Sequence, residues 1–161
     1  MKMKMRGIAS VILLYIVSAC STESVDPAFE EVVPEAVNIV TIEQELLAIV
    51  NSHRTSLGQN ALAYSSIAYP YASAHTDYMI SKGSLSHDNF SARASGISSE
   101  VNAETVAENV AKDYVDASQA FQGWLDSSSH KKTMEGDFTH TAVSVKKDGD
   151  GNLYFTQLFY R

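Results

Sequence analysis

The pattern of hydrophobic and polar positions after residue 40 predicts helices first and strands last. A first helix is expected to begin at Thr41, which has the spacing of a capping box with Gln44, and to end at Gly58. Its apolar positions recur every three or four residues, as on one face of a helix. They are Ile42, Leu46, Ile49, Val50 and Leu57.

Three further helical segments follow. One is expected over residues 66–82, with Pro70 in the first turn, where proline costs little, and Gly83 as its end. The next covers residues 116–126, and Ser129 predicts one more short turn through Met134. The apolar face of residues 116–126 consists of Ala117, Ala120, Phe121, Trp124 and Leu125.

The end of the chain has the two-residue period of strands. Thr141, Val143 and Val145 alternate with smaller residues, residues 148–152 have turn composition, and residues 153–160 are rich in aromatic side chains. This pattern predicts a β-hairpin. Helices followed by antiparallel strands indicate an α+β domain, and residues 41–161 suffice for one hydrophobic core.

Residues 1–19 have the composition of a signal peptide. Lys2, Lys4 and Arg6 precede an apolar run, residues 8–17, that is short for a membrane span. The run leads into Val-Ser-Ala-Cys ending at Cys20, which has the pattern of a bacterial lipobox. We therefore expect cleavage before Cys20 and lipid on its sulfur. The alternatives are ordinary cleavage after Ala19 or an uncleaved anchor.

Residues 20–40 are expected to form an acidic, flexible tether, although residues 37–40 have the alternative of docking as a short strand. The lipid would hold the domain to a membrane outside the cytoplasm. Ser21 is compatible with sorting to the outer membrane if the cell envelope has two membranes.

The cysteine count bears on how the domain is stabilised, and the distribution of charge bears on what it can bind. Cys20 is the only cysteine, so the domain forms no internal disulfide. All 19 acidic residues follow Cys20, whereas three of the 12 basic residues precede it, and no Lys/Arg stripe exists. Phosphate neutralisation needs clustered cations, so we expect no nucleic-acid partner.

The segment around Glu108 is the main candidate for chemistry. If the chain is extended there, Glu108 shares a face with the apolar residues Val106 and Val110. A carboxylate in a dry position needs a partner, and a histidine or a metal ion would serve. The alternative is a glutamate that pairs with a lysine or faces water. His87 follows a helix end and is expected on a loop, where functional side chains are common.

The other histidines carry less information. His130 lies at the start of the short turn and His140 opens the hairpin, but neither belongs to a strong zinc signature. No GxSxG serine elbow is present. His53 and His75 lie on apolar helix faces and are expected to be packed structural residues, as is Trp124.

Several short phrases occur in an order that resembles the CAP superfamily, which includes plant pathogenesis-related proteins, insect venom allergens and bacterial secreted proteins. The phrases are Ser86-His87, Ala107-Glu108-Asn109 and Tyr154-Phe155-Thr156-Gln157, supported by Asn51-x-His53-Arg54, Ser127-x-x-His130 and Phe138-Thr139. The similarity is greatest to the disulfide-free bacterial branch and covers about residues 42–160.

The resemblance implies an α-β-α sandwich with a central antiparallel sheet and an open cleft. It implies His87 and Glu108 as cleft residues, joined by His130, His140, Tyr154 and Gln157. In eukaryotic members a second histidine helps the first to hold zinc, but that position is Tyr154 here. A zinc or other divalent site would have to draw on His87, Glu108, His130 and His140. Ala107 also departs from the family pattern, which has glycine.

Two functions fit these residues, and the first is favoured. In the first, the protein is a lipid-anchored, non-enzymatic module whose cleft binds a small molecule, lipid, peptide or metal ion. In the second, it is a metal-assisted or acid-base hydrolase of peptides or envelope polymers, with Glu108 as general base and His87 as ligand or proton donor. A third, purely structural alternative is that His87 and Glu108 only brace the cleft.

Overall fold

Three long strands form the centre of the sheet in the computed structural model. Strands β4 (His140–Lys147) and β5 (Leu153–Tyr160) form the expected hairpin, and β3 (Val106–Lys112) pairs with the other side of β5. Both of these pairings, β4 with β5 and β3 with β5, are antiparallel. The far edge of β4 carries two short strands, β1 (Val37–Asn38), which is antiparallel to it, and β2 (Ala63–Tyr64), which is parallel.

The structure describes residues 36–161. Residues 1–19, for which a signal peptide is expected, Cys20 and most of the expected tether lie outside the described residues. Within the described part, Val37 and Asn38 dock as strand β1, which agrees with the alternative expected for residues 37–40. No helix of residues 36–161 has both the length and the apolar character needed to cross a membrane.

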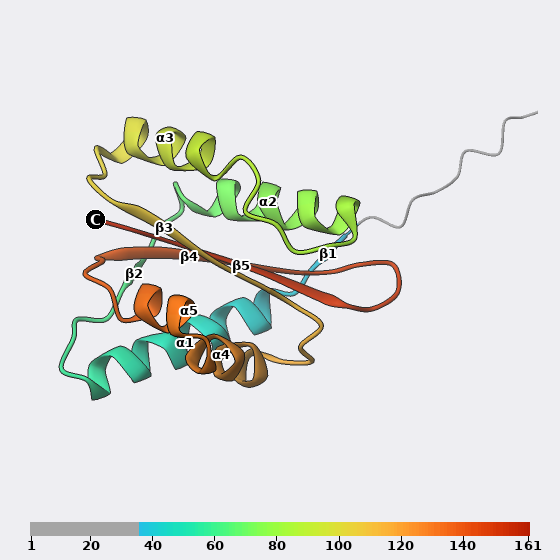
Figure 1. The fold of residues 1–161 in the computed structure, drawn as a ribbon, viewed down its shortest axis with the longest axis horizontal. Helices are drawn as coiled ribbons and strands as arrows, with labels where there is room; N and C mark the ends of the chain where they lie inside the picture. Colours follow the sequence, from blue (N-terminus) through green and yellow to red (C-terminus); the bar gives the residue numbers. More distant parts are fainter. Residues whose placement is uncertain (1–35) are drawn as a thin grey trace, which may run out of the picture. The chain divides into compact units, whose positions relative to one another are not determined.

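Helices cover both faces of the sheet, which makes the domain an α-β-α sandwich (Figure 1). Helices α1 (Val40–Ser56), α4 (Ala117–Asp126) and α5 (Ser128–Met134) lie on one face. Helices α2 (Tyr69–Lys82) and α3 (Phe90–Val101) lie on the other. The sheet is therefore buried on both sides.

Strand β5 lies between the two halves of the core, and all eight of its residues are buried. Phe155 and Phe159 belong to the apolar cluster beneath α1, α4 and α5, whereas Leu158 and Tyr160 belong to the cluster beneath α2 and α3. This division follows from the alternation of side chains along a strand. It also explains why β5 reads as an almost continuous apolar and aromatic run.

Most helix ends agree with the sequence prediction. Gly83 ends α2 with a left-handed φ of 68°, and the Asp116 side chain caps α4 by accepting a hydrogen bond from the Gln119 N–H at 2.8 Å. The predicted capping box at Thr41 is wrong, because α1 begins at Val40 with Ile39 as its N-cap. The Ile39 N–H donates to the Val145 carbonyl at 2.8 Å, so the helix starts directly after the pairing with β4.

Helix α3 was not expected from the sequence. Its twelve residues include four serines and a glycine, which have low helix propensity, and they form no long apolar stripe. Ile97 is its fully buried apolar anchor, and packing beneath α2 and α3 stabilises the helix despite its composition.

Arg54, near the end of α1, is buried and donates only to backbone carbonyls. Its Nη1 reaches Met134 O at 2.7 Å and Gly136 O at 2.8 Å, its Nη2 reaches Phe138 O at 3.2 Å, and its Nε reaches Asn60 O at 3.1 Å. One guanidinium thus attaches the end of α5 and the segment before β4 to α1. These hydrogen bonds give Arg54, the last residue of the Asn51-x-His53-Arg54 phrase, a structural role.

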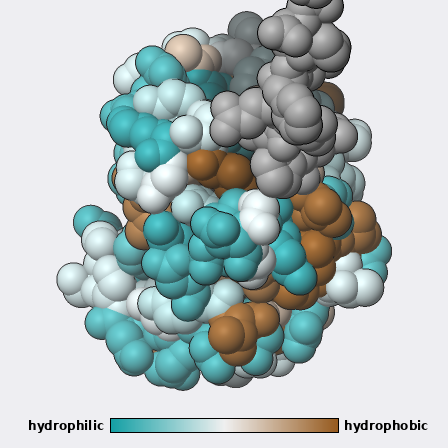
Figure 2. Space-filling model, turned by 90° about the vertical axis from the view of Figure 1, so that its right-hand side faces the viewer, coloured by the Kyte–Doolittle hydropathy of each residue, from teal (hydrophilic) through white to brown (hydrophobic). Residues whose placement is uncertain are grey.

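Apolar side chains are exposed at several places on the surface of residues 36–161. Figure 2 shows several separate hydrophobic patches among hydrophilic side chains on the coloured part of the face that it views. The exposed large apolar residues of the described part are likewise spread over the fold, and they are Val37, Val40, Leu57, Tyr64, Ile67, Leu85 and Val115. Scattered residues of this kind need no partner to explain them.

Candidate functional site

Glu108 lies on β3, the edge strand of the sheet, and points toward α2 and α3. Its neighbours on the same face are Val106, which packs against the cluster beneath α2 and α3, and Val110, which packs with Met79 of α2. The prediction that the three residues share a face is therefore confirmed. The side chain is almost completely buried, so its charge has to be balanced from within the protein.

Arg93 of α3 supplies that balance. Its Nε donates to Glu108 Oε2 at 2.9 Å and its Nη2 donates to Oε1 at 2.9 Å, which is the bidentate arrangement of a strong arginine–carboxylate pair. Its Nη1 donates to the Asp88 carbonyl at 2.6 Å. The pair thus joins the edge of the sheet to α3 and to the loop before it.

Two histidines complete the surroundings of Glu108. His87, on the loop before α3, places Nδ1 2.8 Å from Oε1, and 55% of its side chain is exposed. His75 of α2 is buried, with Nε2 2.7 Å from the Ser86 carbonyl and 3.7 Å from Glu108 Oε1. Burial lowers the pKa of His75, and the negative charge of Glu108 only partly opposes this effect.

A shallow cleft of about 270 Å³ opens beside this cluster. It is lined by His87 and Phe90 on one side of β3, by residues 106–108 of the strand itself, and by Thr133 of α5 on the other side. The cleft therefore crosses the edge of the sheet between the two helical layers. With Nδ1 engaged by Glu108, His87 has Nε2 left to face a ligand.

The exposed edge of β3 contributes backbone groups to the cleft. Thr105 and Arg161 exchange backbone hydrogen bonds, so the odd-numbered residues of β3 pair with β5 and the even-numbered ones point outward. At Val110 the outward carbonyl accepts a hydrogen bond from Trp124 Nε1 at 3.0 Å. No strand of residues 36–161 covers the outward groups of Val106 and Glu108.

His130 lies on α5, on the same side of the helix as Thr133 of the cleft lining. Burial lowers the pKa of its imidazole, and the nearby His87 lowers it further. Its backbone carbonyl accepts a hydrogen bond from Asn109 Nδ2 at 3.1 Å, which holds α5 against β3.

The remaining sequence candidates lie elsewhere. Tyr154 pairs with Lys112 at the far end of β3 and packs against Met79. Gln157 is fully buried and donates to Thr141 Oγ1 at 3.1 Å. His140, two strands away from β3, stacks on Tyr160 with ring centroids 4.8 Å apart. None of these three lines the cleft beside Glu108.

The residues present do not fit a metal site of the expected kind. Within residues 36–161, no three His, Cys, Asp or Glu side chains are placed to share a metal ion. His140 is separated from Glu108 by β5, and the cationic Arg93 already occupies both oxygens of Glu108. A divalent ion would have to displace or approach this guanidinium, so we derive no chemistry through a metal.

Sequence reasoning missed Arg93 and the proximity of His75. His75 is packed and hydrogen-bonded, as expected for a structural residue, but the prediction did not place it beside Glu108. A signal for Arg93 did exist: it is the only Lys or Arg between residues 83 and 111. A carboxylate expected to point inward therefore had one nearby cation in the sequence. The missing information was that residues 90–101 fold as a helix.

Comparison with known families decides the classification. Residues 47–159 match the model of the family described as the cysteine-rich secretory protein family, CAP. The chain belongs to the CAP family. The match runs from the middle of α1 almost to the end of β5, and it includes the Glu108 cluster and the cleft.

One curated relative is the uncharacterized membrane protein YlbC of Bacillus subtilis (strain 168). It is 29% identical over 127 residues, which is 75% of this chain but only 35% of that protein. The CAP chain described here thus spans about a third of the length of this relative.

Solved structures confirm the CAP fold. An outer surface protein from Borrelia burgdorferi superposes with a TM-score of 0.69 at 20% identity, over 78% of this chain and 98% of that one. An extracellular SCP-domain protein from Bacillus anthracis str. Ames has a TM-score of 0.65 at 26% identity, over 76% and 41% of the two chains. A cysteine-rich secretory protein from Staphylococcus aureus has a TM-score of 0.62 at 18% identity, over 75% and 38%.

Proposed function

We propose that this CAP-family protein is a non-enzymatic binding module outside the cytoplasm, whose cleft along β3 binds an extended peptide segment. The observation that carries the proposal is the uncovered outer edge of β3 within the cleft, at Val106 and Glu108. An extended peptide can pair with such an edge through its backbone. The exposed imidazole of His87 would add a hydrogen bond to the bound segment.

The state of Glu108 favours binding over hydrolysis. A general base needs a free lone pair within reach of the water that it activates. Both oxygens of Glu108 accept hydrogen bonds from Arg93, and Oε1 also lies against His87 Nδ1. The carboxylate is therefore better suited to orient His87 than to take up a proton.

The experiment is an NMR titration of the ¹⁵N-labelled full chain in neutral detergent with the blocked pentapeptide acetyl-Thr-Val-Thr-Val-Thr-amide. We expect shifts of the Val106 and Glu108 amides. A Val106→Pro variant removes the outward N–H at a position where an edge strand tolerates proline, and it should weaken binding at least tenfold. Leu85→Ala, which alters an exposed residue of the His87 loop, is the matched control.

Two results would contradict the proposal. One is equal binding of a peptide whose alternate backbone nitrogens are methylated, because that peptide cannot donate to a strand edge. The other is release of peptide fragments by the wild-type protein but not by a Glu108→Gln variant, which would support the hydrolase alternative.

Membrane attachment through Cys20 is a separate part of the proposal. It rests on residues 1–20, and the relatives described as outer-surface, extracellular and membrane proteins are consistent with it. In a bacterial host, the wild-type chain should fractionate with membranes and label with a palmitate analogue. A Cys20→Ser variant should lose the label, and a variant that stays labelled would refute lipidation at this residue.

A further inference from the structure

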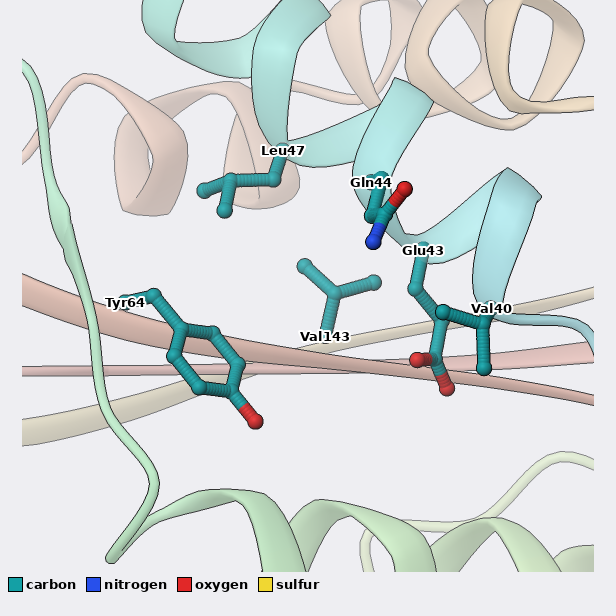
Figure 3. Close-up of a pocket in the computed structure, with 6 residues that line it drawn as sticks. All are labelled: Val40, Glu43, Gln44, Leu47, Tyr64 and Val143. Carbon is teal, nitrogen blue, oxygen red and sulfur yellow. The ribbon is translucent and has the colours of Figure 1, made fainter.

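A second pocket lies at the opposite edge of the sheet, between α1 and strands β2 and β4. It has a volume of about 340 Å³ and is lined by Val40, Glu43, Gln44, Leu47, Tyr64 and Val143. Figure 3 shows these side chains around an open space, with the Glu43 carboxylate and the Tyr64 ring on its lower side. The walls are mainly apolar, and the carboxylate is their charged group.

Glu43 is 8% exposed and has only neutral hydrogen-bond donors. Its Oε1 accepts from the Val145 N–H at 3.0 Å and from one further neutral donor. This donor is either the Tyr69 hydroxyl, at 3.2 Å, or the Asn38 amide, at 2.7 Å, in the orientation in which the Tyr69 hydroxyl donates to the Asn38 oxygen instead. Its Oε2 has only the Tyr69 hydroxyl, at 3.4 Å. This oxygen retains most of its capacity to accept hydrogen bonds.

No Lys, Arg or His of residues 36–161 forms an ion pair with Glu43. Lys146 attracts it from a distance, but the Lys146 Nζ is paired with Asp77 at 2.6 Å. Burial consequently raises the pKa of Glu43, against the opposing effect of its hydrogen bonds. A cation beside the carboxylate would favour the ionised form and remove this penalty.

The floor of the pocket includes an unpaired stretch of backbone. On the outer side of β4, Val145 pairs with Ile39 after β1, and Thr141 pairs with Ser65 after β2. Backbone groups alternate between the two sides of a strand, so those of Val143 point into the gap between these pairs. In the described part of the chain neither its N–H nor its C=O has a partner on this side.

Besides the Glu43 carboxylate and the Val143 backbone, the pocket has an aromatic wall. The Tyr64 ring lines the space and is 54% exposed, and the Tyr69 ring lies 6.2 Å from it at 50°. Aromatic faces attract organic cations, particularly beside a carboxylate. The carboxylate, the free carbonyl and the ring supply acceptors and an apolar surface to the same ligand.

We propose that this pocket binds a small organic ammonium ion. Its N–H groups donate to Glu43 and to the Val143 carbonyl, while its apolar part lies against Tyr64 and Leu47. A primary ammonium has three donors and matches these acceptors, whereas a carboxylate or phosphate ligand would be repelled by Glu43. The site is separate from the cleft at β3 and does not depend on the function proposed for that cleft.

Benzylamine is the probe, and benzyl alcohol is the uncharged control of the same shape. In a calorimetric titration of the full chain at pH 7.5, with a detergent-only blank, we expect benzylamine to bind at least tenfold more tightly than benzyl alcohol. Glu43→Gln should abolish this preference. Tyr64→Leu, at an exposed position that does not endanger folding, should weaken benzylamine binding about threefold or more.

The matched control is His87→Ala, which alters the other cleft and should leave benzylamine affinity unchanged. Amide shifts at Val143 and Val145 should accompany binding and should be absent at Val106. Equal affinity for benzyl alcohol and benzylamine would overturn the proposal, as would shifts confined to β3. An unchanged affinity in both Glu43→Gln and Tyr64→Leu would overturn it as well.

Discussion

Glu43 and Glu108 are both nearly buried, with 8% and 9% of their surfaces exposed, and they lie at opposite edges of the same sheet. Glu108 is bound by a guanidinium and flanked by two histidines, whereas Glu43 has a backbone N–H and a phenol within hydrogen-bonding distance. Residues 36–161 neutralise the Glu108 carboxylate with a cation of their own and provide no such partner for Glu43. Burial alone therefore does not define the role of an acidic residue; the charge of its partners does.

Removal of the cation from the Glu108 cluster should have the largest effect. Arg93→Met leaves a buried carboxylate without its charge partner, and we expect a loss of about 3–5 kcal/mol in the free energy of unfolding. Urea denaturation measures it. Arg161→Met, which breaks an exposed ion pair with Asp137, is the control and should cost less than about 1 kcal/mol. Similar losses in the two variants would mean that the Arg93 pair is energetically ordinary.

Matched Glu→Gln substitutions test the comparison directly. Glu108→Gln leaves Arg93 buried and unpaired, and should cost roughly 2–4 kcal/mol. Glu43→Gln retains an acceptor for the Val145 N–H and removes a desolvated charge, so stability at pH 7 should change by less than about 1 kcal/mol. If Glu43→Gln proved the more damaging of the two in thermal and urea unfolding, the proposed difference between the carboxylates would be wrong.

Because of two histidines, His75 and His130, we expect the folded protein to lose stability in mild acid. Burial lowers the pKa of His75 and His130 in the folded protein, so the unfolded chain binds more protons than the folded one as pH falls below about 6.5. Stability should fall in that range by up to about 1.4 kcal/mol per pH unit for each such histidine. His75→Gln, which retains a donor for the Ser86 carbonyl, should flatten the slope between pH 6.5 and 5.5. An unchanged slope would exclude His75 as a source.

Glu43 should change the pH dependence of stability in the direction opposite to that of the histidines. Its raised pKa means that the folded protein takes up a proton at Glu43 before the unfolded chain does, so this residue adds stability as pH falls toward about 4.5. Glu43→Gln should therefore make the acid-induced loss steeper than in the wild type. A shallower loss in the variant would show that the sign is wrong.

Only a small stability effect is expected for His87→Ala, because more than half of this side chain is exposed. A change within about 1 kcal/mol, together with weaker peptide binding, would separate a ligand-facing role from a structural one. A loss as large as that of Arg93→Met, with no effect on binding, would instead support the interpretation that His87 and Glu108 only brace the cleft.

Local patterns were sufficient for much of the fold. The hairpin of β4 and β5 follows from period-two alternation around a turn, and the ends of α2 and α4 follow from Gly83 and Asp116. The direction of Glu108 follows from the same alternation in β3. Each of these features depends on residues close together in the sequence.

Long-range contacts explain what the sequence did not reveal. Helix α3 has a weak local pattern and is stabilised by packing, and so Arg93 was not placed beside Glu108. The start of α1 depends on the pairing of Ile39 with Val145, about a hundred residues away. The pocket at Glu43 likewise exists only because β1 and β2 meet the edge of β4 and leave Val143 between them.

The backbone carbonyls that accept hydrogen bonds from Arg54 help to fix the width of the cleft. They belong to the C-terminal end of α5 and to the segment that follows it. The Asn109 amide binds the His130 carbonyl in the same helix, so α5 and its cleft residue Thr133 are held from two directions. One wall of the cleft is therefore positioned by two side chains, a guanidinium and an amide, that recognise only the backbone of a seven-residue helix.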